Sequence, residues 1–502
     1  MSGIESEGYY DNALATHNNL VDVTESPESD NARTECGVFA IYVPNQTELA
    51  PSIYLSLQTL QHRGQLSAGI ALSTREGISV FHGEGHVDVA LRHVLPGMPE
   101  ATIGMGHTRY ATSRNKEQPA ERRKRAIMPI FKSTEEQDID DIAVAANCNF
   151  KFARNVADRL GYAYDDFASD GDFVTQLIMD KNIELGDLEK AAIEVLHMFE
   201  DDAFSLSIMT KDKLITFQDP RGIRPLHYGY VPGGGLAVAS ERGALAVIGI
   251  QDTQEFEPGH MMVMDKDGLR TERVFEEKTR KLCVFESVYF SRPDNELLGK
   301  SVWQSRYDSG KELAKVAPVD VDFVAGMPES GLIAAYGYSQ QSGIEYKDAY
   351  VKNRYVGRSF IEPEQELRDG MVGVKLLPLR QNVAGKRLVV VEDSIVRGTT
   401  SRRTVSDLRE NGALEIHFRV ASPPVKWPCF YAVDMKTREE LLANQHDTIE
   451  AMGRYLGVDS IAFLPLDRLL RSVGNNVGEL VCHACFSGKY PTEVPVNLIP
   501  TN

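Results

Sequence analysis

The sequence is poor in three features, and each would have placed it in a particular class of protein. Six cysteines in 502 residues are too few for a disulfide-stapled secreted scaffold. No run approaches the roughly 18 apolar residues of a membrane-spanning helix, and no secretory hydrophobic region opens the chain. Basic residues number 54 against 72 acidic ones, and the net charge of −18 argues against a general nucleic-acid binder. We therefore expect a cytoplasmic protein with reduced thiols and with neither membranes nor nucleic acids as partners.

The composition is that of a globular protein with more than one domain. Hydrophobic residues make up 42% and charged residues 25% of the chain, which is typical of soluble folds. The length exceeds that of one ordinary core, so we expect two or three domains. Residues 1–35 are acidic, carry the single base Arg33 and have few large apolar side chains. They indicate a disordered leader.

Residues 386–401 are the most informative stretch. The apolar run 388–391 predicts a strand buried on both faces. Glu392 and Asp393 follow, then a loop of Gly, Thr and Ser, and then helical spacing over residues 402–412. Backbone N–H groups at such a helix start can receive a 5′-phosphate, while the acidic pair can accept from two ribose hydroxyls. This order resembles the signature of the phosphoribosyltransferases, and the resemblance implies binding of 5-phosphoribosyl-1-pyrophosphate (PRPP) with magnesium. The structural alternative is a strand followed by an acidic turn.

A second candidate site begins at Cys36, just before the apolar run 38–41. Taken alone, a buried structural cysteine at the start of a strand is the better interpretation. Other segments change this: Cys36-Gly-Val-Phe, His62-Arg-Gly-Gln, Gly106-His-Thr-Arg-Tyr, and the surroundings of Asn147 and Asp170. Together they resemble an N-terminal-nucleophile glutamine amidotransferase domain.

Combined with the loop at 392–401, these segments make the chain resemble the glutamine phosphoribosylpyrophosphate amidotransferases from Cys36 to Ile499. The resemblance implies an αββα N-terminal-nucleophile glutaminase domain (α+β) followed by a type I phosphoribosyltransferase α/β domain. The second domain should have a mostly parallel sheet with its site at the carboxyl ends of the strands. The expected divisions are a leader or propeptide at 1–35, a class II glutamine amidotransferase domain at 36–272, a phosphoribosyltransferase domain at 281–470 and a tail at 471–502.

At the glutamine end, the resemblance implies cleavage between Glu35 and Cys36. The freed α-amine, with an ordinary pKa of about 7.7 to 8.0, would act as base for the thiol of its own residue. Arg109 would bind the substrate α-carboxylate, and Asp170 its α-ammonium. Asn147 and the backbone N–H of residue 148 would donate to the oxyanion.

The chain departs from the family pattern in this region. The family has Asn-Gly-Asn where this chain has Asn147-Cys148-Asn149. If the position required φ > 0, a cysteine would cost of order 1 kcal/mol in strain. The substitution is either tolerated, or it weakens the glutaminase, or its thiol perturbs Cys36. Leu66 replaces a usual acid, and the basic run at residues 122–125 is interpreted as a solvated loop.

At the ribose end, the resemblance assigns Ser330, Glu392 and Asp393 to magnesium, with Glu392 in place of the usual Asp. The resemblance also implies a PRPP-binding loop made of Ser394, Arg397, Gly398, Thr399, Thr400 and Ser401. Residues 352–380 would form a mobile flap that closes over PRPP and helps to form an ammonia channel. Lys352 and Arg354 in it would stabilise charge on the departing pyrophosphate.

The four remaining cysteines suggest a metal centre. Cys482-His-Ala-Cys485 alone is compatible with zinc, redox chemistry or chance. Cys283 and Cys429 complete a set of four, which by ligand count suits zinc or a [4Fe–4S] cluster equally. The resemblance is to the cluster-bearing branch of the family, in which the cluster ties the domains and the tail together.

The implied reaction converts glutamine, PRPP and water to 5-phosphoribosylamine, glutamate and pyrophosphate, the first step of purine synthesis. Purine nucleotides are the implied inhibitors, and a homo-oligomer, tetramer or dimer, the implied assembly. Two alternatives remain open. One is a paralogue that uses free ammonia or another amine because Cys148 impairs the glutaminase. The other is a non-catalytic, PRPP-sensing partner.

Overall fold

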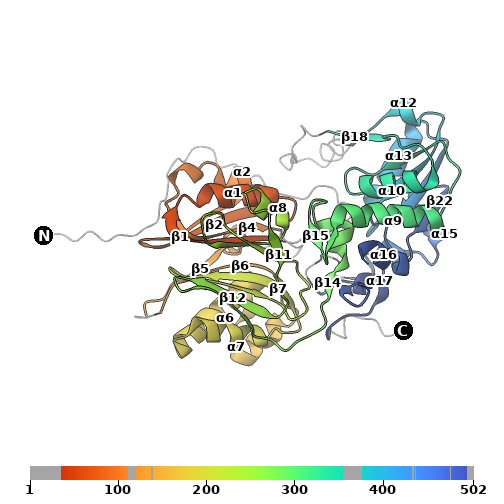
Figure 1. Cartoon of the computed structure of the whole chain (residues 1–502). Coiled ribbons are helices and arrows are strands. Elements are labelled where there is room, and N and C mark those ends of the chain that lie inside the picture. The colour runs from red at the N-terminus through yellow and green to blue at the C-terminus, as the bar shows by residue number, and fades with distance from the viewer. Residues whose placement is uncertain are drawn as a thin grey trace.

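The computed structural model describes residues 36–110, 119–136, 139–353, 376–431, 433, 435, 437–474 and 476–494. Two stacked antiparallel sheets occupy the chain from Gly37 to Arg273, and a parallel sheet lies beside them between Phe323 and Phe463 (Figure 1). Within the described residues, no helix is long and apolar enough to span a bilayer. The leader at 1–35 and most of the expected flap, residues 354–375, lie outside the described residues.

The first sheet has seven strands, with β1 near its centre. In spatial order they are β11 (Thr253–Glu255), β9 (His227–Tyr230), β10 (Leu236–Ala239), β1 (Gly37–Thr47), β4 (Ala101–Arg109), β2 (Ser67–Thr74) and β3 (Gly77–Glu84). The side chains of β1 alternate between the two faces, as the two-residue period of a strand requires. Val38 and Ala40 face the second sheet, whereas Phe39 and Ile41 face the helices outside.

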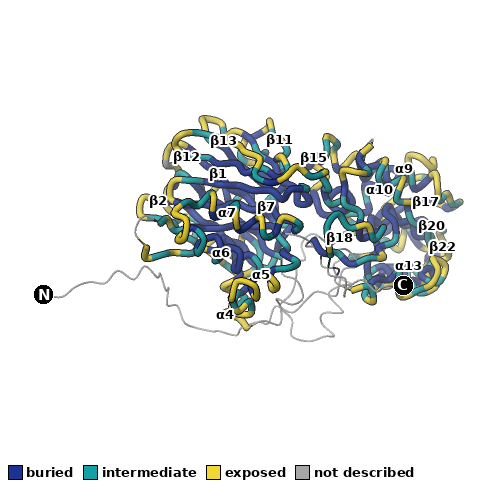
Figure 2. The backbone as a smooth tube through the Cα atoms, turned by 90° about the horizontal axis from the view of Figure 1, so that it is seen from below, coloured by how far each residue is buried: buried dark blue, intermediate teal, exposed yellow. Residues whose placement is uncertain are grey.

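The second sheet has six strands and packs its inner face against the first. Its order is β13 (Gly268–Arg273), β12 (His260–Asp265), β8 (Leu214–Gln218), β7 (Ala203–Met209), β6 (Ile142–Asn149) and β5 (Ile130–Lys132). Val38 and Ala40 share one buried cluster with Ala143 and Ala145 of β6, so the core between the sheets is continuous. The buried strands lie inside and the exposed segments outside in Figure 2.

Helices cover both outer faces of the sandwich. Beside the first sheet lie α1 (Ala50–Thr59), α2 (Val87–Leu91) and α8 (Arg242–Ala246); beside the second lie α5 (Ala153–Leu160), α6 (Asp170–Leu185) and α7 (Leu188–His197). The predicted αββα architecture is therefore confirmed. The expected solvated loop at 122–125 is wrong, because these residues belong to α4 (Ala120–Arg125). Arg122 and Arg125 donate to the carbonyls of Phe167 and Asp166 at 2.6 and 2.9 Å, contacts that a run of charges does not reveal.

The parallel sheet has the order β17 (Phe323–Gly326), β20 (Arg387–Glu392), β21 (Glu415–Val420) and β22 (Ser460–Phe463). Residues of β20 alternate between two buried clusters, which explains why its sequence is apolar throughout. One face packs on α9 (Val302–Val316), α10 (Leu332–Ser342) and α16 (Leu466–Val473), the other on α13 (Thr399–Glu410) and α15 (Ile449–Leu456). This confirms the predicted α/β domain.

Short elements join the sandwich to the parallel sheet. β14 (Leu282–Cys283) pairs in parallel with β23 (Val481–Cys482) of the tail, so Cys283 lies opposite Cys482. A π-helical turn, Glu286–Phe290, then leads towards α9, and α17 (Ala484–Ser487) follows β23. The other elements of the described residues are β15 (Glu296–Leu297), β16 (Lys300–Ser301), β18 (Tyr350–Lys352), β19 (Leu376–Pro378), α12 (Arg380–Val383), α14 (Leu442–Gln445) and two short 3₁₀ helices, Leu95–Gly97 and Tyr164–Asp166.

Candidate active sites

Cys36 and Arg109 lie together at one end of the sandwich. β1 pairs with β4 so that Gly37 lies opposite Thr108, which brings their flanking residues Cys36 and Arg109 side by side. The Cys36 Sγ lies 3.9 Å from the Tyr110 carbonyl oxygen. Burial raises the pKa of the Cys36 thiol, while the charge of Arg109 acts in the opposite direction. A thiol next to a guanidinium suits a nucleophile beside the binding group for a carboxylate.

Asn147 faces the same end of the sandwich from the second sheet. It continues the series of Ala143 and Ala145 along β6, so its side chain lies on the inner face, as does that of Cys36. The residue is 1% exposed and its Nδ2 has no hydrogen-bond partner among the described residues. A buried amide donor without a partner is costly unless a ligand uses it, and an oxyanion formed at Cys36 is such a ligand.

Asp170 begins α6, whose N-cap is Ser169. Its carboxylate accepts from the Phe150 backbone N–H at 3.1 Å and from the Tyr164 hydroxyl. Burial, together with the Asp170 charge, raises the pKa of Tyr164, so this hydroxyl remains a proton donor. Tyr164 orients Asp170, and it was not found from the sequence because a lone Tyr six residues upstream carries no pattern.

Cys148 lies on the other face of β6 from Asn147. Its side chain packs with the cluster of Ala146 and Phe150 beneath α6, and burial raises the pKa of its thiol well above the ordinary value, with Asp170 adding to the effect. Among the described residues, only Leu298 and Asn476 are non-glycine residues with positive φ. The position is an ordinary strand residue, so the strain considered for a cysteine here does not arise.

His107 connects the two sheets beside these groups. It is fully buried, and its Nε2 lies 3.1 Å from the Ala146 carbonyl oxygen, the residue before Asn147. Burial lowers the pKa of His107 to about 3, so the ring is neutral at physiological pH and its Nε2–H donates. The histidine holds the strand of Arg109 against that of Asn147, a role that the sequence motif alone did not indicate.

A buried ion-pair network links the sandwich to the π-helical turn. Arg63 is fully buried; its Nε lies 2.5 Å from Glu241 and its Nη2 2.5 Å from Glu286. Burial acts to lower the pKa of the Arg63 guanidinium, but the charges of Glu286 and Glu241 outweigh it and hold this pKa above the ordinary value. The motif containing Arg63 was recognised from the sequence, but nothing local revealed a partner 223 residues away.

The acidic pair lies at the carboxyl end of β20. Glu392 and Asp393 are 5% and 3% exposed, and the Ser394 hydroxyl donates to Asp393 Oδ1 at 2.6 Å. Asp393 Oδ2 is buried without a partner among the described residues. Burial raises the pKa of Asp393, whereas hydrogen bonds with neighbours that include Ser330 act to lower it. An orphan carboxylate oxygen beside a serine hydroxyl suits a hard cation or a ribose hydroxyl.

The loop after the acidic pair opens α13 as predicted. Gly398 is its N-cap with φ 82°, a backbone conformation that favours glycine. A Cβ there would also lie only 2.9 Å from Leu442 Cδ2, so both the backbone conformation and the available space favour glycine. Thr399, Thr400 and Ser401 form the first helical turn, where N–H groups can bind phosphate.

The basic residues expected at this site differ in position. Arg397 Nη2 contacts Glu440 at 2.6 Å, so it helps to fix the loop. Lys352 lies 3.4 Å from Glu329, next to Ser330. Arg354 lies outside the described residues.

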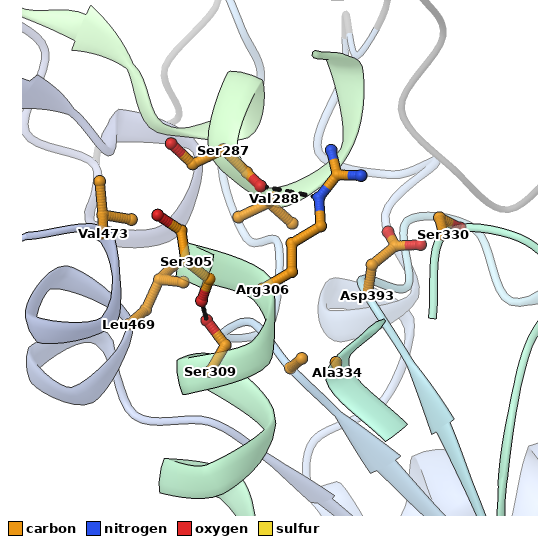
Figure 3. A pocket seen from close by; sticks show the side chains of 11 residues that line it. Ser287, Val288, Ser305, Arg306, Ser309, Ser330, Ala334, Asp393, Leu469 and Val473 are labelled. Atoms are coloured by element: carbon orange, nitrogen blue, oxygen red, sulfur yellow. Dashed lines mark hydrogen bonds between the residues drawn. The ribbon is translucent and has the colours of Figure 1, made fainter. Parts of the chain in front are cut away.

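A small cavity of about 10 Å³ adjoins Asp393. Figure 3 shows Arg306 reaching from α9 between Ser287 and Asp393. Its guanidinium donates to the carbonyls of Ser287, Tyr289 and Ser291 at 2.9, 2.9 and 2.8 Å. Arg306 therefore fastens the π-helical turn beside the acidic pair, another contact that the sequence did not indicate.

The four remaining cysteines surround a second cavity of about 20 Å³, which Cys283, Cys429, Cys482 and Cys485 line together. Within the described part of the chain, no three Cys, His, Asp or Glu side chains converge closely enough to hold a single ion. Burial raises the pKa of Cys482 to about 12 and that of Cys283 well above its ordinary value, and the charge of the buried Arg224 opposes both shifts. A cavity lined by thiols beside a buried cation fits a group that carries negative charge.

Comparisons with known proteins agree with this geometry. A scan against protein-family models finds no match. The amidophosphoribosyltransferase of Mycobacterium bovis is 37% identical over 503 residues, which cover 98% of this chain and 93% of that protein. The chain belongs to the amidophosphoribosyltransferase family.

Two solved structures are similar to this member of the amidophosphoribosyltransferases over 92% of its length at 36% identity. One is described as the allosteric regulatory enzyme of purine biosynthesis, with a TM-score of 0.83 over 98% of that chain. The other is glutamine phosphoribosylpyrophosphate amidotransferase from B. subtilis complexed with ADP and GMP, with a TM-score of 0.82 over 99% of that chain. The fold predicted from the sequence is thus the fold of this enzyme family.

Proposed function

We propose that this amidophosphoribosyltransferase transfers the amide nitrogen of glutamine to PRPP, giving 5-phosphoribosylamine, glutamate and pyrophosphate. The observation that carries the proposal is the pairing of two sites in one chain. One holds the half-buried thiol of Cys36 at the same end of the sandwich as the unpaired amide of Asn147, and the other holds the unpaired carboxylate oxygen of Asp393. The first suits amide hydrolysis, and the second suits a ribose phosphate.

At the glutamine site, the Cys36 thiol attacks the side-chain amide carbon of glutamine. Arg109 binds the α-carboxylate and Asp170, oriented by Tyr164, the α-ammonium. Asn147 Nδ2 and the Cys148 N–H donate to the developing oxyanion. The thiol gives its proton to the α-amine of Cys36, which passes it to the leaving ammonia; water then releases glutamate.

At the ribose site, ammonia attacks the anomeric carbon and pyrophosphate leaves. The first turn of α13 binds the 5′-phosphate through N–H groups of Thr399, Thr400 and Ser401. Glu392 and Asp393 accept from the ribose hydroxyls. Magnesium, held by Ser330, Glu392 and Asp393, would neutralise charge on the pyrophosphate. Lys352 and, from the flap, Arg354 would contribute further positive charge.

The two alternative functions receive less support. An ammonia-only paralogue required Cys148 to disturb the glutaminase, but its thiol packs under α6 on the opposite strand face from Asn147. A non-catalytic PRPP sensor would not need an orphan amide donor opposite Cys36. Relatives over nearly the whole length are named as the enzyme.

The base at the glutamine site requires a free α-amine on Cys36, so the proposal includes removal of residues 1–35 as a propeptide. Intact-mass measurement of protein from its native host tests this. A chain that begins at Cys36 is expected. Retention of the leader in active protein would contradict the assignment of the α-amine as base.

For the cysteine cavity we propose a [4Fe–4S] cluster held by Cys283, Cys429, Cys482 and Cys485. Thiols spread around a cavity suit a four-iron cube better than zinc, whose four ligands converge on one ion. The cluster would be structural, because glycosyl transfer moves no electrons. Anaerobically purified protein should contain about four irons and four sulfides per chain. One zinc per chain without iron would overturn this assignment.

Regulation and assembly are proposed from the family. The similar B. subtilis enzyme was solved with ADP and GMP, so purine nucleotides are the proposed inhibitors. We also propose a cytoplasmic homo-oligomer, a dimer or tetramer. The proposed domains are 36–272, 281–470 and the tail 471–502; the last sandwich strand ends at Arg273, close to the first boundary.

The direct test is an assay of purified, processed protein with PRPP and magnesium. Pyrophosphate should appear with glutamine as well as with ammonium, and glutamate should form in equal amount. Release of pyrophosphate with ammonium but never with glutamine would reject the main proposal in favour of the ammonia-dependent alternative.

A further inference from the structure

The strand that carries the oxyanion donors ends in a contact with a distant part of the chain. Asn149 is the last residue of β6 and pairs with Ala203 of β7. Its Nδ2 donates to the Phe430 carbonyl oxygen at 2.8 Å, across 281 residues of sequence. Phe430 directly follows Cys429, so the loop of that cysteine is tied to the end of β6.

Lys151 forms a second tie, two residues further on. On the sandwich side, its ammonium donates to the Asp201 carbonyl at 2.8 Å and lies 3.5 Å from the Asp202 carboxylate. The side chain of Lys151 is 1% exposed and that of Asp202 is 3% exposed. On the tail side, it donates to Thr492 Oγ1 at 2.6 Å and to the Glu493 carbonyl at 3.0 Å. A buried ammonium with partners on both sides resists separation of the two parts, because removing either set leaves a buried charge.

The residues that receive these contacts are themselves fixed to one another. We call Phe430, Tyr431, Tyr490 and Thr492 the brace. Tyr431 Oη and Thr492 Oγ1 lie 2.8 Å apart, and the Thr492 N–H donates to the same Tyr431 oxygen at 3.2 Å. The rings of Phe430 and Tyr490 lie 5.2 Å apart, and the Lys151 ammonium lies 4.9 Å from the centre of the Tyr431 ring.

The end of β6 needs such support because a neighbouring strand pairs with it on one side only. β5 pairs with β6 only along Ile142–Val144. β7 pairs with β6 on the other side, from Ala143 to Asn149. In the described sheets, residues 145–149 therefore have a strand partner on the β7 side alone. Strand ends with few partners open locally at low cost.

We propose that the brace positions the oxyanion segment, and that Asn149 and Lys151 are the positioning residues through which the brace sets the rate of glutamine hydrolysis. The inference rests on the proposed glutaminase chemistry. The nucleophile Cys36 belongs to the first sheet and the donor Asn147 to the second. The distance between them depends on how the end of β6 is held, and donors must be held to within about 0.5 Å of the productive geometry.

This positioning role predicts a particular kinetic pattern. Phe150 lies between Asn149 and Lys151, and its N–H donates to Asp170. Loosening the end of β6 should therefore disturb the group that binds the glutamine α-ammonium, so the KM for glutamine should rise as its kcat falls. The ribose site lies in the loop 392–401, so ammonia-dependent synthesis should persist. Only the glutamine-dependent reaction should be impaired. A purely architectural role would instead lower both activities together.

The experiment uses the full processed chain with its cluster and compares four variants. Asn149→Ala removes the donor to Phe430, and Asn149→Gln restores an amide donor. Thr492→Val removes the tail hydroxyl while preserving its shape. Asn444→Ala is the matched control, because Asn444 Nδ2 also donates to a backbone carbonyl close in sequence to Cys429, that of Lys426 at 2.9 Å.

Steady-state rates with glutamine and with ammonium are measured, together with hydrogen exchange of residues 142–149. For Asn149→Ala and Thr492→Val we expect the glutamine kcat to fall about tenfold or more, since a misplacement of about 1 Å can cost about 10²-fold. The ammonium rate should stay within about twofold, and exchange at 142–149 should become faster. Asn149→Gln should recover part of the rate, and Asn444→Ala should behave as wild type.

Three results would overturn the brace. They are an unchanged glutamine kcat in Asn149→Ala, a parallel fall in both activities, or an equal loss in Asn444→Ala. Failure of the proposed function is a separate result: wild-type protein would then make no product from glutamine. In that case only hydrogen exchange of residues 142–149 tests whether the brace holds β6. An unchanged exchange rate in Asn149→Ala would reject it.

Discussion

The two candidate sites are built in different ways. The ribose site comes almost entirely from one turn, residues 392–401, with Ser330 added from the neighbouring strand end. The glutamine site is assembled from four separate places: the residue before β1, the end of β4, the end of β6 and the start of α6. One site is local, and the other depends on the register of two sheets.

This difference makes the two sites separable by experiment. Ammonia bypasses the glutamine site but not the ribose site, so each substitution can be assigned by measuring both activities. Changes at the glutamine end should affect one activity and changes at the ribose end both. The predictions below test that separation, starting from the largest expected effect.

Replacing the nucleophile should give the largest and most selective loss. Cys36→Ser should lower the glutamine-dependent rate by at least about 10³-fold, because loss of a nucleophile can cost up to about 10⁶-fold in a hydrolase. The ammonium-dependent rate should remain within about twofold. Pyrophosphate release with each nitrogen donor measures both, and an equal fall in the two rates would show that the sites are not separable.

Replacing the orphan carboxylate should remove both activities. Asp393→Asn should lower the glutamine- and ammonium-dependent rates alike by about 10²- to 10³-fold, through lost stabilisation of charge. Asp320→Asn is the control, because that side chain is 94% exposed near the same sheet. Retention of ammonium-dependent synthesis in Asp393→Asn would contradict its place at the ribose site.

The buried network at Arg63 should matter for stability. Arg63→Met removes the guanidinium from two buried carboxylates, Glu286 and Glu241, of which Glu241 keeps its contact with His62. The loss should lower the free energy of unfolding by about 3 to 5 kcal/mol. Arg409→Met breaks a pair with Asp459 whose side chains are 33% and 39% exposed, and should cost less than about 1 kcal/mol. Urea denaturation compares them. Similar losses of unfolding free energy in Arg63→Met and Arg409→Met would show that the buried network stabilises the protein no more than an exposed ion pair does.

His107 should make the fold sensitive to acid. Burial lowers its pKa to about 3 in the folded protein, while the unfolded chain binds a proton near pH 6.5. The stability is therefore fully present above about pH 6.5 and is lost progressively as the pH falls towards 3. Urea denaturation at pH 7 and pH 5 should show a smaller pH effect in His107→Gln than in wild type. Identical pH effects would exclude His107 as the cause.

The substitution that distinguishes the glutamine end from its family pattern should have the smallest effect. Cys148→Gly should leave the glutamine kcat and KM within about twofold, because the thiol packs under α6 while Asn147 faces the nucleophile. Steady-state kinetics with glutamine measure this. A large rise in glutamine-dependent rate would mean that Cys148 does weaken the glutaminase.

The same difference explains what the sequence could predict. The ribose loop was found from residues 388–401 alone, because strand, acidic pair and helix start are consecutive. Cys36 and Asn147 were found only through a family resemblance, since no local pattern brings together residues on different sheets. Tyr164, Arg306, His107 and Asn149 were missed, because each acts through a partner that only the fold places beside it.

The central claim is that nitrogen passes from the amide of glutamine to the ribose carbon. The most direct measurement supplies glutamine labelled with ¹⁵N in its amide, together with PRPP, magnesium and unlabelled ammonium at low concentration. The account predicts ¹⁵N-labelled 5-phosphoribosylamine and glutamate in equal amounts, and no labelled product from Cys36→Ser. Product that carries only unlabelled nitrogen from wild-type protein would contradict it.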